Sequence, residues 1–176
     1  MIFTGVKITG NVDCADDSKK LTFKQREELV NKIKSNVVHC SIITTAEEID
    51  NIGLSKAIKK SLESIIEYFG ENEKYLYDGN KTFGVENKNL ETLVKADALV
   101  KGVGAASIIA KHLKDQLMLS HHEEFPMYGF SNNFGYITKS HVQAIKDFGY
   151  CKYHRHSYKI KELEDFKNKQ STNCLF

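Results

Sequence analysis

The spacing of apolar side chains predicts strands and helices that alternate from the first residues onward. Short runs rich in β-branched residues, Ile2–Thr9 and Val37–Thr44, are typical of strands. Between them, Thr22 and Gln25 form a capping-box pattern that predicts the start of a helix ending near Asn36. The first quarter of the chain is therefore expected to fold as strand, helix and strand.

The clearest helical pattern follows a short predicted helix at Ala46–Ile52. We expect Ser55 to cap this second helix and Gly70 to end it. Its apolar positions recur with helical spacing on one face: Ile58, Leu62, Ile65, Ile66 and Phe69. The opposite face is polar, so the pattern predicts an amphipathic helix.

The second half of the chain continues the alternation. Strands are predicted at Lys74–Tyr77 and Leu90–Val94, a largely apolar helix at Gly104–Leu119, and a last helix at Ser140–Phe148. The intervening segment His121–Tyr136 is rich in aromatic and loop-forming residues. Strands that alternate with helices predict an α/β domain with a mixed sheet.

Composition narrows the class of protein. The 176 residues are 41% hydrophobic and include one proline, which excludes disordered and proline-rich chains. We expect a single domain over residues 1–176, with a charged tail at about 161–176. No apolar stretch reaches membrane-spanning length and no leader-like pattern opens the chain, so we expect a cytoplasmic protein with no membrane partner.

Charge points to a local rather than a global binding surface. The net charge of +2 does not indicate a polyanion partner by itself. Basic clusters occur at Lys19-Lys20 and at Lys152–His156, where cations mix with aromatic rings as in single-strand and hybrid binders. The alternative for each cluster is an ordinary solvated surface.

Cysteine and histidine spacing offers a weaker alternative. Four widely spread cysteines contain no Cys-x-x-Cys pair, so free thiols are expected: Cys14, Cys40, Cys151 and Cys174. Cys151, His154 and His156 could form part of a zinc site if His121 or His122 supplied a fourth ligand. An unrelated α/β metal-binding domain is thus one hypothesis.

Two aspartates offer a stronger chemical signal. Asp78 and Asp97 are expected at the ends of neighbouring strands, each beside small residues. Hard oxygen ligands of this kind, with room for a phosphate, suit a divalent-cation site. Because Asp-Gly is a common turn dipeptide, the alternative for Asp78 is a simple turn.

Five segments carry short motifs in order along the chain: Asp17–Leu21, Leu76–Asn80, Lys95–Lys111, Tyr128–His141 and His154–Tyr158. Taken together they closely resemble the ordered motifs of ribonuclease HII. That family cleaves RNA in RNA–DNA hybrids and at ribonucleotides embedded in DNA. The resemblance runs from about Gly5 to Tyr158 and therefore covers most of the chain.

The resemblance implies a ribonuclease H-like mixed sheet flanked by helices, with four carboxylates that hold two Mg²⁺ or Mn²⁺ ions. Asp78 matches the third carboxylate and Asp97 the fourth. Ser18 and Lys19 match the loop that grips phosphates of the DNA strand. Tyr136 matches the tyrosine that packs on the deoxyribose next to the ribonucleotide, the alternative being a core tyrosine.

One family motif has no counterpart here. Members begin with a strand leading to Gly-x-Asp-Glu-Ala-Gly-Arg-Gly, which supplies the first two carboxylates, and Asp16-Asp17 belongs to a different match. We therefore expect an N-terminally truncated domain that lacks the first, central strand. The function is either that of a two-metal ribonuclease HII endonuclease or that of a non-catalytic remnant that still binds hybrids. We expect a monomer, and no cleavage by residues 1–176 alone.

Overall fold

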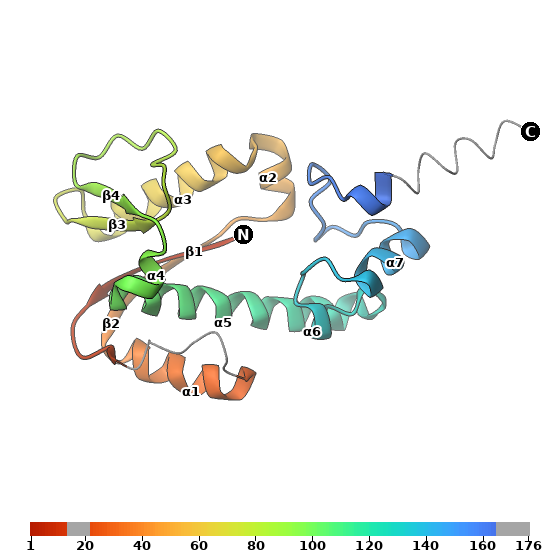
Figure 1. Ribbon diagram of the computed structural model, residues 1–176, viewed down its shortest axis with the longest axis horizontal. Coiled ribbons are helices and arrows are strands. Elements are labelled where there is room, and N and C mark those ends of the chain that lie inside the picture. The colour runs from red at the N-terminus through yellow and green to blue at the C-terminus, as the bar shows by residue number, and fades with distance from the viewer. Residues whose placement is uncertain (14–21, 165–176) are drawn as a thin grey trace, which may run out of the picture. The chain divides into compact units, whose positions relative to one another are not determined.

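The computed structural model describes residues 1–13 and 22–164, which form two compact units (Figure 1). The first unit comprises Met1–Thr44 and Ile52–Lys114. The second comprises Thr45–Asn51 and the described residues from Asp115 onward. The expectation of a single domain over residues 1–176 stays a prediction.

Two long strands open the first unit. Strand β1 (Ile2–Ile8) pairs antiparallel with β2 (Val37–Ile43), and the register runs from Ile2 opposite Ile43 to Ile8 opposite Val37. Both strands were predicted to within a residue, because β-branched side chains fit the pleated surface of a sheet.

The helices of the first half also follow their sequence signals. Helix α1 (Phe23–Lys34) begins with the predicted capping box, in which the Thr22 side chain accepts the N–H of Gln25. Helices α2 (Ala46–Ile52) and α3 (Leu54–Phe69) follow. The prediction that Ser55 caps α3 is wrong. The cap is Gly53, whose φ of 82° suits glycine, and Ser55 lies inside the first turn.

The second strand pair is short. Strand β3 (Tyr75–Asp78) runs parallel to β4 (Leu90–Leu93), with Tyr75 opposite Leu90 and Asp78 opposite Leu93. The mixed α/β class is confirmed, since one pair is antiparallel and the other parallel. Among the described residues, however, the pairs form two separate two-stranded sheets rather than one, because a cavity lies between β1 and β3.

Helix α5 (Lys101–Glu124) is longer than its apolar pattern predicted at both ends. The pattern marked the part that is buried, which includes Ala105, Ile108 and Ile109. A Cβ at Gly102 would lie 3.0 Å from Ile8 Cδ1, so this glycine allows α5 to approach β1 closely. Gly102 therefore has a packing role.

Short helices dominate the rest of the chain. The four-residue helix α4 (Ala96–Leu99) precedes α5, and the 3₁₀ turn η2 (Pro126–Tyr128), α6 (Phe130–Asn133) and α7 (Lys139–Phe148) follow it. The predicted last helix is confirmed, with Thr138 as its cap and Gly149 at its end. In the described part of the chain, no helix has both the length and the apolar character that a membrane crossing requires.

Candidate metal and nucleic-acid site

Asp78 is the last residue of β3, where the strand turns into Gly79. Its Oδ1 accepts the backbone N–H of Ala96 at 3.0 Å. The Gly79 N–H in turn donates to the Leu93 carbonyl of β4 at 3.2 Å. Asp78 is therefore more than a turn residue, because its carboxylate ties the end of β3 to the segment that carries Asp97.

The sequence predicted that Asp97 ends a strand, but this prediction is wrong. Strand β4 stops at Leu93, and Asp97 lies in the first turn of α4. Lys95 adopts the left-handed conformation (φ 60°) just before that helix and turns the chain sharply. The tight turn replaces the expected strand end and places Asp97 directly after the residue that holds Asp78.

Both aspartates line one cavity of about 570 Å³ in the first unit. Their oxygens are the hard ligands that Mg²⁺ and Mn²⁺ prefer, so the donor chemistry fits a divalent cation. The set is small, however. Residues 1–13 and 22–164 contain no group of three His, Cys, Asp or Glu side chains that could hold a metal ion. Further ligands must come from water, a substrate phosphate or other carboxylates.

Tyr136 belongs to the second unit, and its side chain is 60% exposed. The alternative of a core tyrosine is therefore wrong. The backbone is held on both sides, since its N–H donates to the Asn133 carbonyl at 2.8 Å and its carbonyl lies 3.0 Å from His141 Nδ1. Tyr136 thus presents a solvated ring from a fixed backbone.

Two histidines complete this support. The Cys151 N–H donates to His154 Nδ1 at 3.0 Å, so His154 carries its proton on Nε2. His154 Nε2 lies 3.0 Å from His141 Nε2 and donates to it, which leaves His141 to donate from Nδ1 to the Tyr136 carbonyl. The His154 ring is neutral in this arrangement. Burial, and then the neighbouring His141, lowers the pKa of His154 from 6.5 to about 4.

The chain is similar in sequence to known proteins. The family model for ribonuclease HII matches residues 13–161. The chain belongs to the ribonuclease HII family. A protein named ribonuclease HII from Sulfurovum sp. is 41% identical over 165 residues, which cover 94% of this chain and 86% of that protein. The ribonuclease HII of Campylobacter jejuni is 40% identical over 160 residues, covering 91% and 83%.

Solved structures confirm the fold. Ribonuclease HII of Archaeoglobus fulgidus, in a structure described as its complex with PCNA, matches with a TM-score of 0.77 at 21% identity, covering 94% of this chain and 91% of that one. Ribonuclease H2 of Pyrococcus horikoshii matches with a TM-score of 0.69 at 20% identity, covering 96% and 100%. The ribonuclease H-like architecture expected of the family is therefore present.

The predicted site residues of this ribonuclease HII family member fall into three groups. Ser18 and Lys19, which were predicted to bind phosphates of the DNA strand, lie outside the described residues. Asp78 and Asp97 share one cavity, and Tyr136 belongs to the other unit. The sequence analysis missed Ala96, whose N–H fixes the Asp78 carboxylate. A backbone donor has no side-chain signature by which the sequence could reveal it.

The zinc hypothesis gains no support from the described residues. Cys151 Sγ does lie 3.1 Å from His154 Nδ1, but that nitrogen already accepts the Cys151 N–H. Burial raises the pKa of the Cys151 thiol, whereas zinc binds the thiolate. The backbone N–H of His156 donates to Asp50, and His121 stacks on Tyr153. Cys40 and Cys151 are free thiols, as expected.

Proposed function

We propose that this protein is an endonuclease that hydrolyses the RNA strand of RNA–DNA hybrids and cuts at ribonucleotides embedded in DNA. Asp78 and Asp97 would hold divalent cations, Mg²⁺ or Mn²⁺, at the cavity. The observation that carries this proposal is the link between them: both line the cavity, and the carboxylate of Asp78 binds the residue preceding Asp97.

The two carboxylates have a defined task in this chemistry. A bound divalent cation supplies charge that favours hydroxide formation from water and stabilises the departing 3′-oxygen. Asp78, oriented by the Ala96 N–H, would present its second oxygen toward the cavity. Asp97 would add a second negative charge from the first turn of α4. Removing either charge weakens the attraction for a cation.

Recognition of the duplex would involve other residues. The exposed ring of Tyr136 offers a flat surface that could pack on a sugar, and its anchored backbone lowers the entropy lost when the ring binds. Ser18 and Lys19 would contact phosphates, which positions the duplex without reading its sequence.

A cleavage assay tests the aspartates. The substrate is a DNA duplex with one embedded ribonucleotide, in Mg²⁺ or Mn²⁺, and the enzyme is residues 1–176 preceded by a segment with the family motif Gly-x-Asp-Glu-Ala-Gly-Arg-Gly. We expect Asp78→Asn and Asp97→Asn each to lower cleavage by more than the ~10–100-fold that the loss of an outer-shell partner costs. Asp147→Asn, on the exposed face of α7, is the matched control.

A control for folding distinguishes loss of the site from loss of the fold. Circular dichroism spectra of both variants should match the parent protein, because the substitutions keep side-chain size. Parent-like cleavage in either variant would remove that aspartate from the site. Residues 1–176 without the added segment should not cleave, because they carry two of the four carboxylates that the family resemblance implies.

A non-catalytic, hybrid-binding protein is the second candidate. The described residues favour it in one respect, since they hold no group of three metal-ligating side chains. Residues 1–176, which carry two of the four carboxylates that the family resemblance implies, would then bind a hybrid without cutting it. Lys19→Ala should then lower hybrid affinity equally across sequences and flatten the slope of log affinity against log salt by about one unit. An unchanged slope would place Lys19 on a solvated surface.

A further inference from the structure

One buried side chain fixes the start of the loop that carries Tyr136. Asn133 is 7% exposed. Its Nδ2 donates to the Tyr128 carbonyl at 2.7 Å, and its Oδ1 accepts the N–H of Gly135 at 2.8 Å. Phe134 and Gly135 both adopt the left-handed conformation, with φ of 48° and 79°. Because a bulky residue rarely adopts such a φ, the bonds of Asn133 hold a turn that is strained at Phe134.

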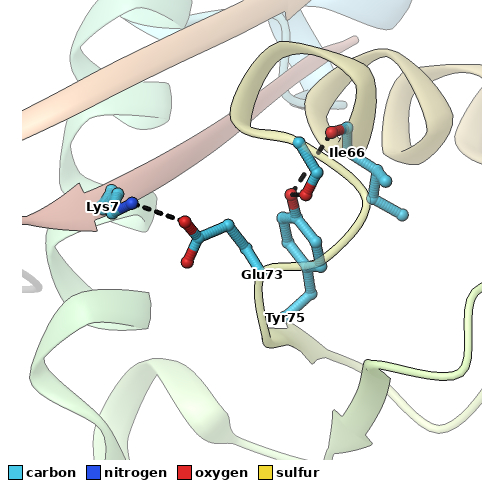
Figure 2. Close-up of polar contacts among 5 residues, drawn as sticks. Lys7, Ile66, Glu73 and Tyr75 are labelled. Carbon is cyan, nitrogen blue, oxygen red and sulfur yellow. Dashed lines mark hydrogen bonds and ion pairs between the residues drawn. The ribbon is translucent and has the colours of Figure 1, made fainter.

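Tyr136 itself is held through its peptide groups. A tyrosine can also be held by its hydroxyl, as Figure 2 shows for Tyr75, whose OH lies 3.3 Å from the Ile66 carbonyl and 2.7 Å from the Gly70 carbonyl. The ring of Tyr136 is 60% exposed, and the carbonyl of the same residue lies 3.0 Å from His141 Nδ1. Because this bond holds the peptide that follows the ring, His141 helps to set the direction in which the ring points.

His141 is fixed by its place on α7 and by a second histidine. Its backbone N–H donates to the Thr138 side chain that caps the helix, and the residue is 5% exposed. Its Nε2 lies 3.0 Å from His154 Nε2. Donation from His154 to this nitrogen leaves the His141 proton on Nδ1, which faces the Tyr136 carbonyl. The hydrogen bond to Tyr136 therefore depends on the tautomer of His154.

A tight turn imposes the tautomer of His154. The Cys151 N–H donates to His154 Nδ1 at 3.0 Å, and the His154 N–H donates to the Cys151 carbonyl at 3.0 Å. The ring proton of His154 is therefore on Nε2, which faces His141. Burial lowers the pKa of His154 from 6.5 to about 4, so the ring stays neutral at pH 7. Three aromatic rings lie around the imidazole, at centroid distances of 4.8, 5.7 and 5.5 Å: Tyr128, Phe130 and Tyr150.

We propose that His141 and His154 are positioning residues for Tyr136. The proton on His154 Nε2 directs the proton of His141 to Nδ1, and His141 then holds the peptide that carries the ring. A histidine next to the Cys151 turn thereby controls how well the Tyr136 ring binds a nucleic-acid duplex. The inference rests on the proposed contact of Tyr136 with a sugar, and it does not depend on the metal site or on cleavage.

Duplex binding at pH 7 tests the proposal. The probe is a fluorescein-labelled DNA duplex with one embedded ribonucleotide, titrated with residues 1–176 in EDTA, and the readout is fluorescence anisotropy. His154→Leu removes the Nε2 donor and should weaken binding ~2–10-fold, the effect expected of one hydrogen bond. His154→Gln places an amide N–H donor near the position of Nε2 and should recover most of that loss. Tyr136→Ala should weaken binding at least as much as His154→Leu, because it removes the ring itself.

A double variant shows whether His154 acts through Tyr136. If it does, His154→Leu should weaken binding no further in a protein that already carries Tyr136→Ala. Ile145→Val is the control for lost stability, because Ile145 belongs to the same buried cluster, and it should leave the affinity unchanged. An equal loss from His154→Leu with and without the tyrosine would overturn the proposal, since the histidine would then support the unit as a whole.

Nuclear magnetic resonance tests the same chain of bonds without nucleic acid. Long-range proton–nitrogen spectra of the wild type at pH 7 should show the ring proton of His154 on Nε2 and that of His141 on Nδ1. The carbonyl carbon shift of Tyr136 should change in His154→Leu and stay unchanged in Ile145→Val. The opposite tautomers, or an unchanged Tyr136 shift in His154→Leu, would overturn the proposal.

The binding results also separate this proposal from the function on which it rests. Duplex affinity unchanged by Tyr136→Ala would show that the proposed contact of the ring is wrong, and the positioning role would be overturned with it. Weaker binding by Tyr136→Ala beside unchanged binding by His154→Leu would overturn the positioning role alone. Cleavage results with the aspartate variants bear on neither outcome, because binding is measured in EDTA.

Discussion

The two units bury their apolar side chains in different ways. The first unit divides its buried residues into two clusters, one around α1 and α5 and one around α3 and β4. The second unit gathers its buried residues in one cluster between Tyr128 and Leu163, with aromatic rings packed around His154. In the part of the chain that the structure describes, strands β1 and β3 of the first unit line a cavity.

The difference follows from where each unit finds its hydrogen-bond partners. Helices and turns in the second unit satisfy their backbone groups within a few residues, as the Thr138 cap and the Cys151–His154 turn show. Strands in the first unit need partners far along the chain, and each has one. A unit made of strands is therefore sensitive to a missing neighbour, whereas a unit made of short helices is not.

The largest expected effect compares two isoleucines of equal burial. Ile145 of α7 is 5% exposed and lies in the closed cluster of the second unit, whereas Ile65 of α3 is 7% exposed and lines the cavity. We expect Ile145→Ala to cost about 3–4 kcal/mol and Ile65→Ala about 1–2 kcal/mol, because the second void merges with existing space.

Native-state hydrogen exchange of α7 and α3 measures the two costs separately. Equal costs would show that the cavity is closed in solution, and that the two units do not differ in how tightly they pack.

Acid should weaken the second unit first. The pKa of His154 is about 4 in the folded state and near 6.5 when unfolded, so the unfolded chain binds more protons between these values. Besides burial, the neighbouring His141 and His156 hold this pKa down. Stability is therefore complete above about pH 6.5 and falls toward pH 4, by roughly 1–2 kcal/mol after allowance for solvent screening.

Urea unfolding of the wild type and of His154→Gln between pH 7 and 4 checks this. The variant should be less stable at pH 7 but should lose less stability on acidification. Identical pH slopes in the two proteins would show that His154 is charged in the folded state.

Helix caps should show no contrast between the units. Thr22 caps α1 in the first unit and Thr45 accepts the Glu48 N–H at the start of α2 in the second. Since capping is local, we expect Thr22→Ala and Thr45→Ala each to cost about 1 kcal/mol in thermal unfolding. A much larger cost at either site would mean that the threonine also supports tertiary packing.

The smallest expected effect concerns the ion pair beside the cavity. Because the Lys7–Glu73 pair is exposed, Lys7→Ala should change stability by less than ~1 kcal/mol, and salt should remove even that difference. A larger cost in a salt titration would show that the pair holds β1 and β3 together and closes the cavity.

Much of the local structure was present in the sequence. Ile2–Ile8 and Val37–Ile43 follow from runs rich in β-branched residues, and the apolar face of α3 follows from helical spacing. Both signals depend on neighbouring residues alone. The capping box at Thr22 and the stop at Gly149 were also predicted, for the same reason. Ser55 does not cap α3, because the helix begins at Leu54 and its cap is Gly53, which has a positive φ.

In the candidate site, too, the sequence determined some features and the tertiary structure decided others. The motifs gave Asp78, Asp97 and Tyr136 as candidates, because residue types and their order can be read from the sequence alone. That Asp78 is held by the Ala96 N–H, that Tyr136 is exposed on an anchored backbone, and that β1 and β3 border one cavity were decided by tertiary structure alone. These features depend on backbone groups and on residues brought together from distant positions, and a linear pattern does not specify such contacts.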